Sequence, residues 1–202
     1  VVMKTLDWAY NRALKGMGGI DSAIELGDSY LKQKGTLEQQ VDSLIKWQLT
    51  KAATSGFITG LGGLATMPFT LPANIASVIY LQIRMISAIA YMGGHDIKSD
   101  RVKSLIYICM VGNGAKELLK NFGITAGEKL LTHLMTEISA KTILYVNQKV
   151  GYKLLAKFGE KGAAHLGKAI PLAGGIIGGT IDAASTRIVG KVAKKIFIQN
   201  CN

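Results

Sequence analysis

Charged side chains are almost missing from one long stretch of this chain. Residues 52–94 are 43 in number, and only Arg84 among them carries a charge. Such a stretch must be covered by a protein core, a partner or a bilayer. Because Pro68 and Pro72 rule out a straight helix through it, we expect a hydrophobic helical hairpin over residues 56–92 with a proline-containing corner.

Cysteine is scarce as well. Cys109 and Cys201 make no disulfide framework, and neither belongs to a CxxC pair. We expect no signal peptide, because Lys4 and Asp7 interrupt the first segment before an apolar region develops. A reducing, cytoplasmic location is therefore expected.

Motifs of catalysis and metal binding are also lacking. Neither GxSxG nor HExxH occurs. Residues 162–168 have the GxxxxGK spacing of a phosphate-binding loop, but Ala169 stands where that loop needs Ser or Thr. His133 and Glu137 lie four residues apart, yet a metal site needs three or more ligands. The sequence favours a non-enzymatic protein without a metal or cofactor.

Basic residues, in contrast, are abundant. The chain has 24 Lys and Arg against 13 Asp and Glu, a net charge of +11. Such an excess attracts anionic lipid or nucleic acid, or only keeps the protein soluble. No nucleic-acid-binding motif is recognisable, so nucleic acid is the disfavoured partner.

Helical periodicity runs through most of the chain, and no strand pattern of useful length occurs. We predict an all-α, single-domain helical bundle in which residues 1–35 form amphipathic helices continuous with a domain over residues 36–198. Asp21 is expected to cap a helix over 21–34, and Thr36 to start the next. Further along, glycines predict helix breaks at Gly123 and Gly151.

A helix from Thr70 to about Met92 carries one narrow polar stripe, formed by Ser77, Tyr80, Arg84, Ser87 and Tyr91. It is long enough to cross a bilayer, but an arginine near the middle costs about 2.5–3.5 kcal/mol there. A buried hairpin is favoured over conditional or integral insertion. Arg84 needs a partner, and Asp182 is the natural one because no other acid follows Glu160.

The chain closes with a glycine-rich segment that becomes a basic amphipathic helix. Gly174 with Gly178, and Gly175 with Gly179, have the spacing that allows a second helix to approach closely. The basic residues that follow are expected to contact an anionic membrane, or else are merely solvated: Arg187, Lys191, Lys194 and Lys195.

Polar side chains near this segment form one candidate site. We expect Gln82, Arg84, Asp182, Ser185 and Thr186 either to line a small-ligand or lipid-headgroup pocket or to form a buried network that fixes the register of the helices.

Two segments carry a family resemblance. Leu64–Ala73, followed by Leu81–Ile86 and Gly94–Asp96, resembles the central motif of the bacterial EcsC family, and Pro171–Phe197 resembles its C-terminal motif. The resemblance covers roughly residues 40–198. The chain departs from the pattern at three positions: Thr70 for an acid, His95 for an aromatic and Asp182 for Asn. The family is named after a product of an ABC-transporter operon, which implies a helical, membrane-associated or cytoplasmic protein without an agreed reaction.

Three functions remain open. The leading hypothesis is a non-enzymatic protein, peripheral at the inner membrane, that contacts anionic lipid or a membrane partner such as a transporter. The second is a pore-forming type of effector whose 56–92 hairpin enters the bilayer. The third is a hydrolase or ligand binder with its site around Arg84 and Asp182. The oligomeric state is not indicated by the sequence.

Overall fold

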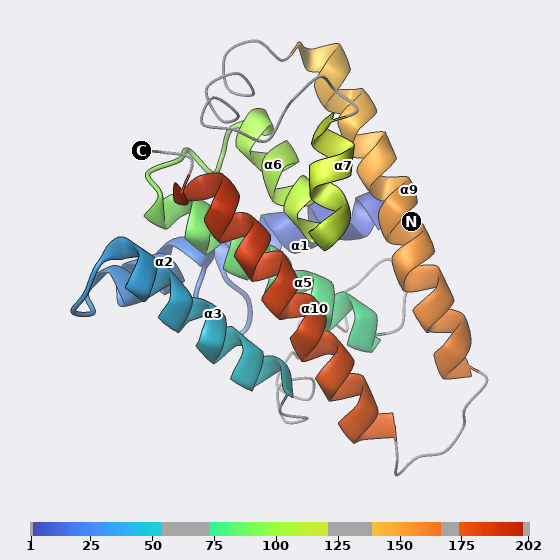
Figure 1. Cartoon of the computed structure of the whole chain (residues 1–202), viewed down its shortest axis with the longest axis horizontal. Coiled ribbons are helices and arrows are strands. Elements are labelled where there is room, and N and C mark those ends of the chain that lie inside the picture. Colours follow the sequence, from blue (N-terminus) through green and yellow to red (C-terminus); the bar gives the residue numbers. More distant parts are fainter. Residues whose placement is uncertain (1, 54–72, 121–138, 167–173, 200–202) are drawn as a thin grey trace.

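The computed structural model of the chain describes residues 2–53, 73–120, 139–166 and 174–199, and within these ranges the side chains of 51–53, 73–74, 158–166 and 174–182 are left out. Helices dominate the described residues and no strand occurs among them, which confirms the expected all-α fold (Figure 1). In chain order the elements are α1 (Val2–Lys15), α2 (Ala23–Leu31), α3 (Leu37–Ala53), α5 (Ala73–Met92), α6 (Asp100–Met110), the short 3-10 helix η2 (Gly112–Gly114), α7 (Ala115–Lys120), α9 (Ala140–Leu166) and α10 (Gly174–Phe197).

Side-chain caps set the starts of the helices. The Ser22 hydroxyl accepts a hydrogen bond from the Glu25 amide, and the Glu25 carboxylate accepts one from the Ser22 amide. This reciprocal capping box starts α2, so the expectation that Asp21 is the cap was wrong. Thr36 and Gln39 make the same pair of bonds before α3, which agrees with the predicted start at Thr36.

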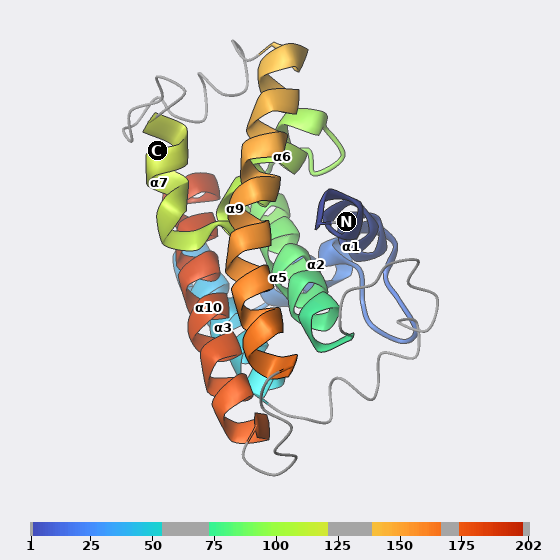
Figure 2. The same ribbon diagram turned by 90° about the vertical axis from the view of Figure 1, so that its right-hand side faces the viewer.

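Helix α5 is the centre of the bundle. It packs against α1, α2, α3, α6 and α10, and Figure 1 and Figure 2 both show it enclosed by other helices. Its Ile75–Met92 part is long and apolar enough to span a membrane, and no other helix in the described ranges is. Of these residues only Val78 and Tyr91 are not buried. The preceding half of the expected hairpin, with Pro68 and Pro72, lies outside the described residues.

Helix α10 runs parallel to α5 and antiparallel to α3. Its end meets the end of α5, where the His95 ring packs on Phe197 with ring centroids 5.3 Å apart and donates from Nε2 to the Phe197 carbonyl at 3.1 Å. Close contact with α3 occurs at Gly190, because a Cβ there would lie 3.0 Å from the Ile45 side chain. A glycine at position 190 therefore lets α3 and α10 approach.

Helix α9 continues through Gly151, so the predicted break there was wrong. The glycine lies where α9 meets α1: a Cβ at this position would lie 3.1 Å from the Met3 sulfur. Close helix contact, rather than a chain turn, explains the residue. The break predicted at Gly123 and a helix expected over 125–139 fall almost entirely outside the described residues.

Candidate functional site

The polar stripe of α5 lies inside the protein and faces α1 and α2. Near its start, the rings of Tyr80 and Trp8 of α1 have centroids 6.3 Å apart. At its end, the Tyr91 hydroxyl donates to Asp28 of α2 at 2.7 Å. The polar stripe predicted from the sequence thus includes residues at the contacts of α5 with the first two helices.

Arg84 lies in the middle of this stripe and is only 2% exposed. Its Nε and Nη1 atoms are buried without a hydrogen-bond partner in the described part of the chain. The same is true of two neighbouring polar atoms, the Tyr80 hydroxyl and the indole Nε1 of Trp8. Buried donors without acceptors are costly, so this cluster is the most unusual polar feature of the described core.

The electrostatic surroundings of Arg84 come from Tyr80 of α5 and from residues at and near α2. Burial lowers the pKa of Arg84, while the carboxylates of Asp21 and Glu25 oppose that shift. Both acids are exposed at the surface, and neither makes an ion pair with the guanidinium in the described structure. Two solvent-screened carboxylates compensate a buried charge only in part.

The pairing of Arg84 with Asp182 stays a prediction, because the side chain of Asp182 lies outside the described residues. The remaining members of the predicted site divide into two groups. Gln82 faces α10, where its Nε2 donates to the hydroxyls of Ser185 at 3.3 Å and Thr186 at 3.1 Å. Arg84, two residues along α5, lies on a different face of the helix, where the carboxylates of Asp21 and Glu25 act on its pKa.

The contact between Gln82, Ser185 and Thr186 links the centres of two parallel helices. Gln82 and Thr186 are buried, and the Gln82 Oε1 atom has no partner among the described residues. Because such side-chain bonds form only when the helices are aligned, they fix the register of α5 against α10.

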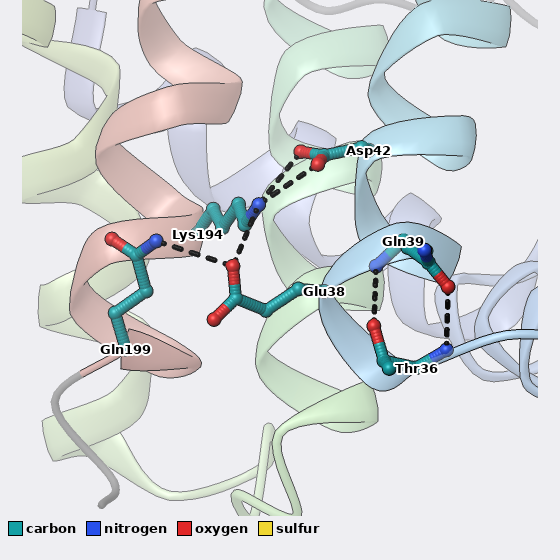
Figure 3. Close-up of polar contacts among 6 residues, drawn as sticks. All are labelled: Thr36, Glu38, Gln39, Asp42, Lys194 and Gln199. Carbon is teal, nitrogen blue, oxygen red and sulfur yellow. Dashed lines mark hydrogen bonds and ion pairs between the residues drawn. The ribbon is translucent and has the colours of Figure 1, made fainter.

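The basic residues of α10 fall into two environments. Arg187, Lys191 and Lys195 are exposed and follow one another at four-residue spacing, which places them along one side of the helix. Lys194 points instead toward α3, as Figure 3 shows. Its Nζ lies 2.9 Å from both carboxylate oxygens of Asp42 and 3.1 Å from Glu38.

These ion pairs alter the ionisation of the groups involved. The hydrogen bond from Lys194 lowers the pKa of Glu38. Burial acts to lower the pKa of Lys194, but its hydrogen bonds to Asp42 and Glu38 outweigh that effect and raise it. Lys194 therefore joins α10 to α3, in addition to any role at the surface. The surroundings of the four glycines expected to pack closely (Gly174, Gly175, Gly178 and Gly179) lie outside the described side chains.

A groove of about 510 Å³ between α1, α6 and α9 was not anticipated from the sequence. Asp7 lies on its wall and accepts two bonds at 2.7 Å, from the Lys103 ammonium and the Tyr107 hydroxyl. Burial and this bond raise the pKa of Tyr107. Asn147 of α9 also lines the groove, and its buried Oδ1 has no partner within the described ranges. Three segments that are distant in sequence form this groove, so no local sequence motif predicts it.

The described residues give no support for a metal site or for a phosphate-binding loop. No group of three potential metal ligands occurs among the described residues, and His133 and Glu137 lie outside them. Residues 162–166, the first part of the GxxxxGK match, belong to helix α9 rather than to a loop after a strand. The geometry of a phosphate-binding loop is therefore absent there.

Comparison with known proteins agrees with the helical architecture. The EcsC protein family matches residues 22–199 of the chain. The chain belongs to the EcsC family. No curated protein and no solved structure shows a significant match. The family match of this EcsC-family chain begins at Ser22, the cap of α2, so it includes Arg84, Tyr80 and Glu25 but not Trp8 or Asp21.

Proposed function

We propose that this EcsC-family protein is a non-enzymatic, peripheral protein of the inner surface of a bacterial membrane. It attaches to anionic lipid, alone or beside a membrane partner such as a transporter. The observation that carries the proposal is the exposed line of Arg187, Lys191 and Lys195 on α10. No acidic residue follows Asp182, so nothing on this part of the helix neutralises the line.

The charge distribution along the chain supports the same proposal. Residues 121–202 hold eleven basic and four acidic side chains, whereas residues 1–120 hold thirteen and nine. The basic excess thus concentrates in the part that contains α9 and α10. Each Lys or Arg close to an anionic membrane contributes about 1 kcal/mol of attraction, screened beyond roughly 10 Å by salt.

The test is co-flotation with vesicles of neutral or partly anionic lipid, at low and high salt. We expect binding to anionic vesicles that weakens with salt. Replacing Arg187, Lys191 and Lys195 by Gln should lower the affinity about 100-fold, because three such contacts are lost. A protein that floats with neither lipid contradicts the proposal.

A matched control removes the same charge elsewhere. Lys32 and Lys34 are exposed in the connection between α2 and α3, and Lys46 is exposed on α3. Their replacement by Gln should leave most of the binding intact. An equal loss in both triple variants would mean that only net charge matters and that α10 is not the contact.

Membrane insertion of the 56–92 hairpin remains the alternative. Helix α5 would have to leave five neighbouring helices to enter a bilayer. Salt-resistant binding together with dye leakage from vesicles would support this second mode, and binding without leakage would support the peripheral one.

A ligand site at Arg84 is a second candidate function, favoured by the unpartnered donors around it. The guanidinium and indole N–H groups can only donate, so the fitting ligand is an anion such as phosphate, a carboxylate or a lipid headgroup. Its binding would give an acceptor to the unpartnered nitrogens of Arg84. No nucleophile with an activating base accompanies them in the described core, so we propose binding rather than hydrolysis.

Thermal unfolding with added anions tests this candidate. Inorganic phosphate, acetate and a short-chain phosphatidylglycerol each compete for the same donors, and the comparison distinguishes a free anion from a headgroup. Stabilisation of the wild type but not of Arg84→Met would support a site at Arg84. Equal stabilisation of both proteins would locate the anion elsewhere.

A further inference from the structure

The outward side of α9 exposes an apolar surface. Seven large hydrophobic side chains in the described residues are exposed, and four of them belong to α9: Leu144 (65%), Tyr145 (51%), Tyr152 (71%) and Leu155 (52%). At 3.6 residues per turn they fall within an arc of about 100°. We call these four residues the α9 arc.

The other side of the same helix is already used for packing. Val146, Val150 and Leu154 are buried, and α9 packs on α6 and α1. Figure 1 shows α9 at the flank of the molecule and Figure 2 shows it in front of the bundle, so the helix lies on the outside. A surface helix normally has polar residues opposite its buried stripe. The α9 arc departs from that rule, because four exposed apolar side chains share that side with the polar Lys141 and Gln148, and such a mixed surface suits an amphipathic occupant.

The charged residues of α9 itself near the arc are basic, whereas Asp7 and Asp100 of the neighbouring helices line the groove beside Leu144. No acid lies between Ser139 and Lys157. Lys141 and Gln148 are exposed within the arc and Lys149 is exposed beside it, and the Lys149 ammonium lies 5.3 Å from the centre of the Tyr145 ring. An occupant with anionic groups around an apolar interior complements this arrangement.

We propose that α9 is the membrane-docking helix, which lies in the headgroup region of an anionic bilayer with the α9 arc turned toward the acyl chains. This inference rests on the proposed peripheral function and assigns its apolar contact. Leucines enter the acyl boundary, tyrosines keep their hydroxyls at the headgroups, and lysines meet lipid phosphates. The basic line of α10 supplies attraction, whereas the α9 arc supplies insertion.

A second copy of the chain fits the α9 arc less well. A two-fold contact through α9 would bring Lys141 and Lys149 of both copies together, where their charges repel. A stable dimer also buries about 800 Å² per partner, far more than four partly exposed side chains on one helical ridge supply.

The test compares Leu144→Ser/Leu155→Ser with wild-type full-length protein in the same vesicle assay. Both residues are exposed, so the double variant should fold normally, with circular dichroism as the check. We expect its affinity for anionic vesicles to fall by about an order of magnitude or more. Trp47→Ser is the matched control, because Trp47 is a similarly exposed apolar residue (56%) on α3; it should bind like the wild type.

A second measurement reports the depth of α9 directly. Tyr152→Trp should shift its fluorescence to the blue on vesicle binding and be quenched by lipids brominated near the top of the acyl chain. Unshifted fluorescence in bound protein would overturn the proposal, as would normal binding by Leu144→Ser/Leu155→Ser.

The outcomes separate this inference from the proposed function. If only the α10 charge variant loses binding, the membrane function holds and the role of α9 is refuted. If the wild type binds no vesicle, both fail. If the wild type is a dimer in solution and Leu144→Ser/Leu155→Ser is a monomer, the arc's occupant is a second copy and the docking proposal is overturned.

Discussion

Replacement of Arg84 by methionine should stabilise this protein in the absence of a ligand. Arg84 is 2% exposed, and two of its nitrogens have no partner in the described core. Methionine retains an unbranched, adaptable stem while removing both the charge and the unpaired donors. The variant therefore tests whether the buried guanidinium is compensated within the folded protein.

The magnitude follows from the unpaired groups. Each buried donor without an acceptor costs about 1–3 kcal/mol. Part of the gain is lost, because methionine is shorter and leaves a small void. We expect Arg84→Met to raise the free energy of unfolding by about 1–3 kcal/mol, in the range found when buried ionic groups are replaced by apolar ones. For a domain of this size that corresponds to a melting temperature higher by roughly 2–12 °C.

Urea unfolding followed by circular dichroism, together with calorimetry, measures the effect. Tyr80→Phe should act in the same direction by up to about 1 kcal/mol, since the hydroxyl it removes is also unpartnered in the described structure. Arg84→Lys is the control that keeps the charge, and it should bring no stabilisation.

A loss of about 3–5 kcal/mol in Arg84→Met would refute the reasoning, because that is the cost of breaking a buried ion pair. The arginine would then have an acidic partner beyond the described side chains, and Asp182 is the one that the sequence predicts. In that case the double exchange Arg84→Asp/Asp182→Arg should restore folding.

Three shorter predictions concern the helix contacts. Gly93→Ala should destabilise by about 1–3 kcal/mol in urea unfolding, because its Cβ would meet the carbonyl oxygen of Phe197; a change below about 0.5 kcal/mol would mean that α5 and α10 do not meet there. Gly151→Pro should cost about 3 kcal/mol or more, since α9 is continuous, whereas a break at that position would tolerate proline. Lys194→Met should flatten the pH profile of the melting temperature at both ends. The pKa of Glu38 is lowered on folding, so its contribution is present above its unfolded value and is lost as pH falls through the folded one; the pKa of Lys194 is raised, so its contribution is lost as pH rises through the folded value.

Local patterns predicted the helices well where one physical signal decides them. On α3 the helical spacing of Val41, Leu44 and Ile45 identifies the buried side, and all three are buried. Thr36 was recognised as a helix start because a hydroxyl followed by an amide three residues on is a local arrangement. Ser22 was missed because neighbouring Asp21 is an equally good cap by residue type.

The direction of each polar group was harder to predict, because it depends on the packing of helices distant in sequence. Gln82 and Arg84 are two residues apart, and the sequence analysis placed them in one cluster. A helix turns about 200° in two residues, so they lie on different sides: Gln82 bonds to α10, whereas Arg84 feels the carboxylates at and before the start of α2. That angular difference was available from the sequence, but the identity of the partner helices was not.

Helix α9 illustrates the opposite failure. Its hydrophobic residues occur on nearly all sides of the helix, so their periodicity did not show which ones are buried. The sequence analysis therefore assigned the membrane contact to the basic C-terminal helix instead. Packing decides the matter: Val146, Val150 and Leu154 are covered, and the α9 arc is left exposed. An apolar surface on a basic helix becomes visible only once its neighbours are known.

Among the helices that the structure describes, the most apolar one, α5, is thus the least accessible. Composition alone would assign α5 to the bilayer, yet its apolar surface is covered by five helices and its polar stripe is turned inward. The proposed membrane contact belongs instead to α9 and α10, whose mixture of Tyr, Leu, Lys and Arg suits a headgroup region better than a hydrocarbon core. Attachment and the Arg84 cluster then lie on different helices. Variants of α9 and α10 should therefore change vesicle binding without changing the response of the protein to anions, and Arg84→Met should do the reverse.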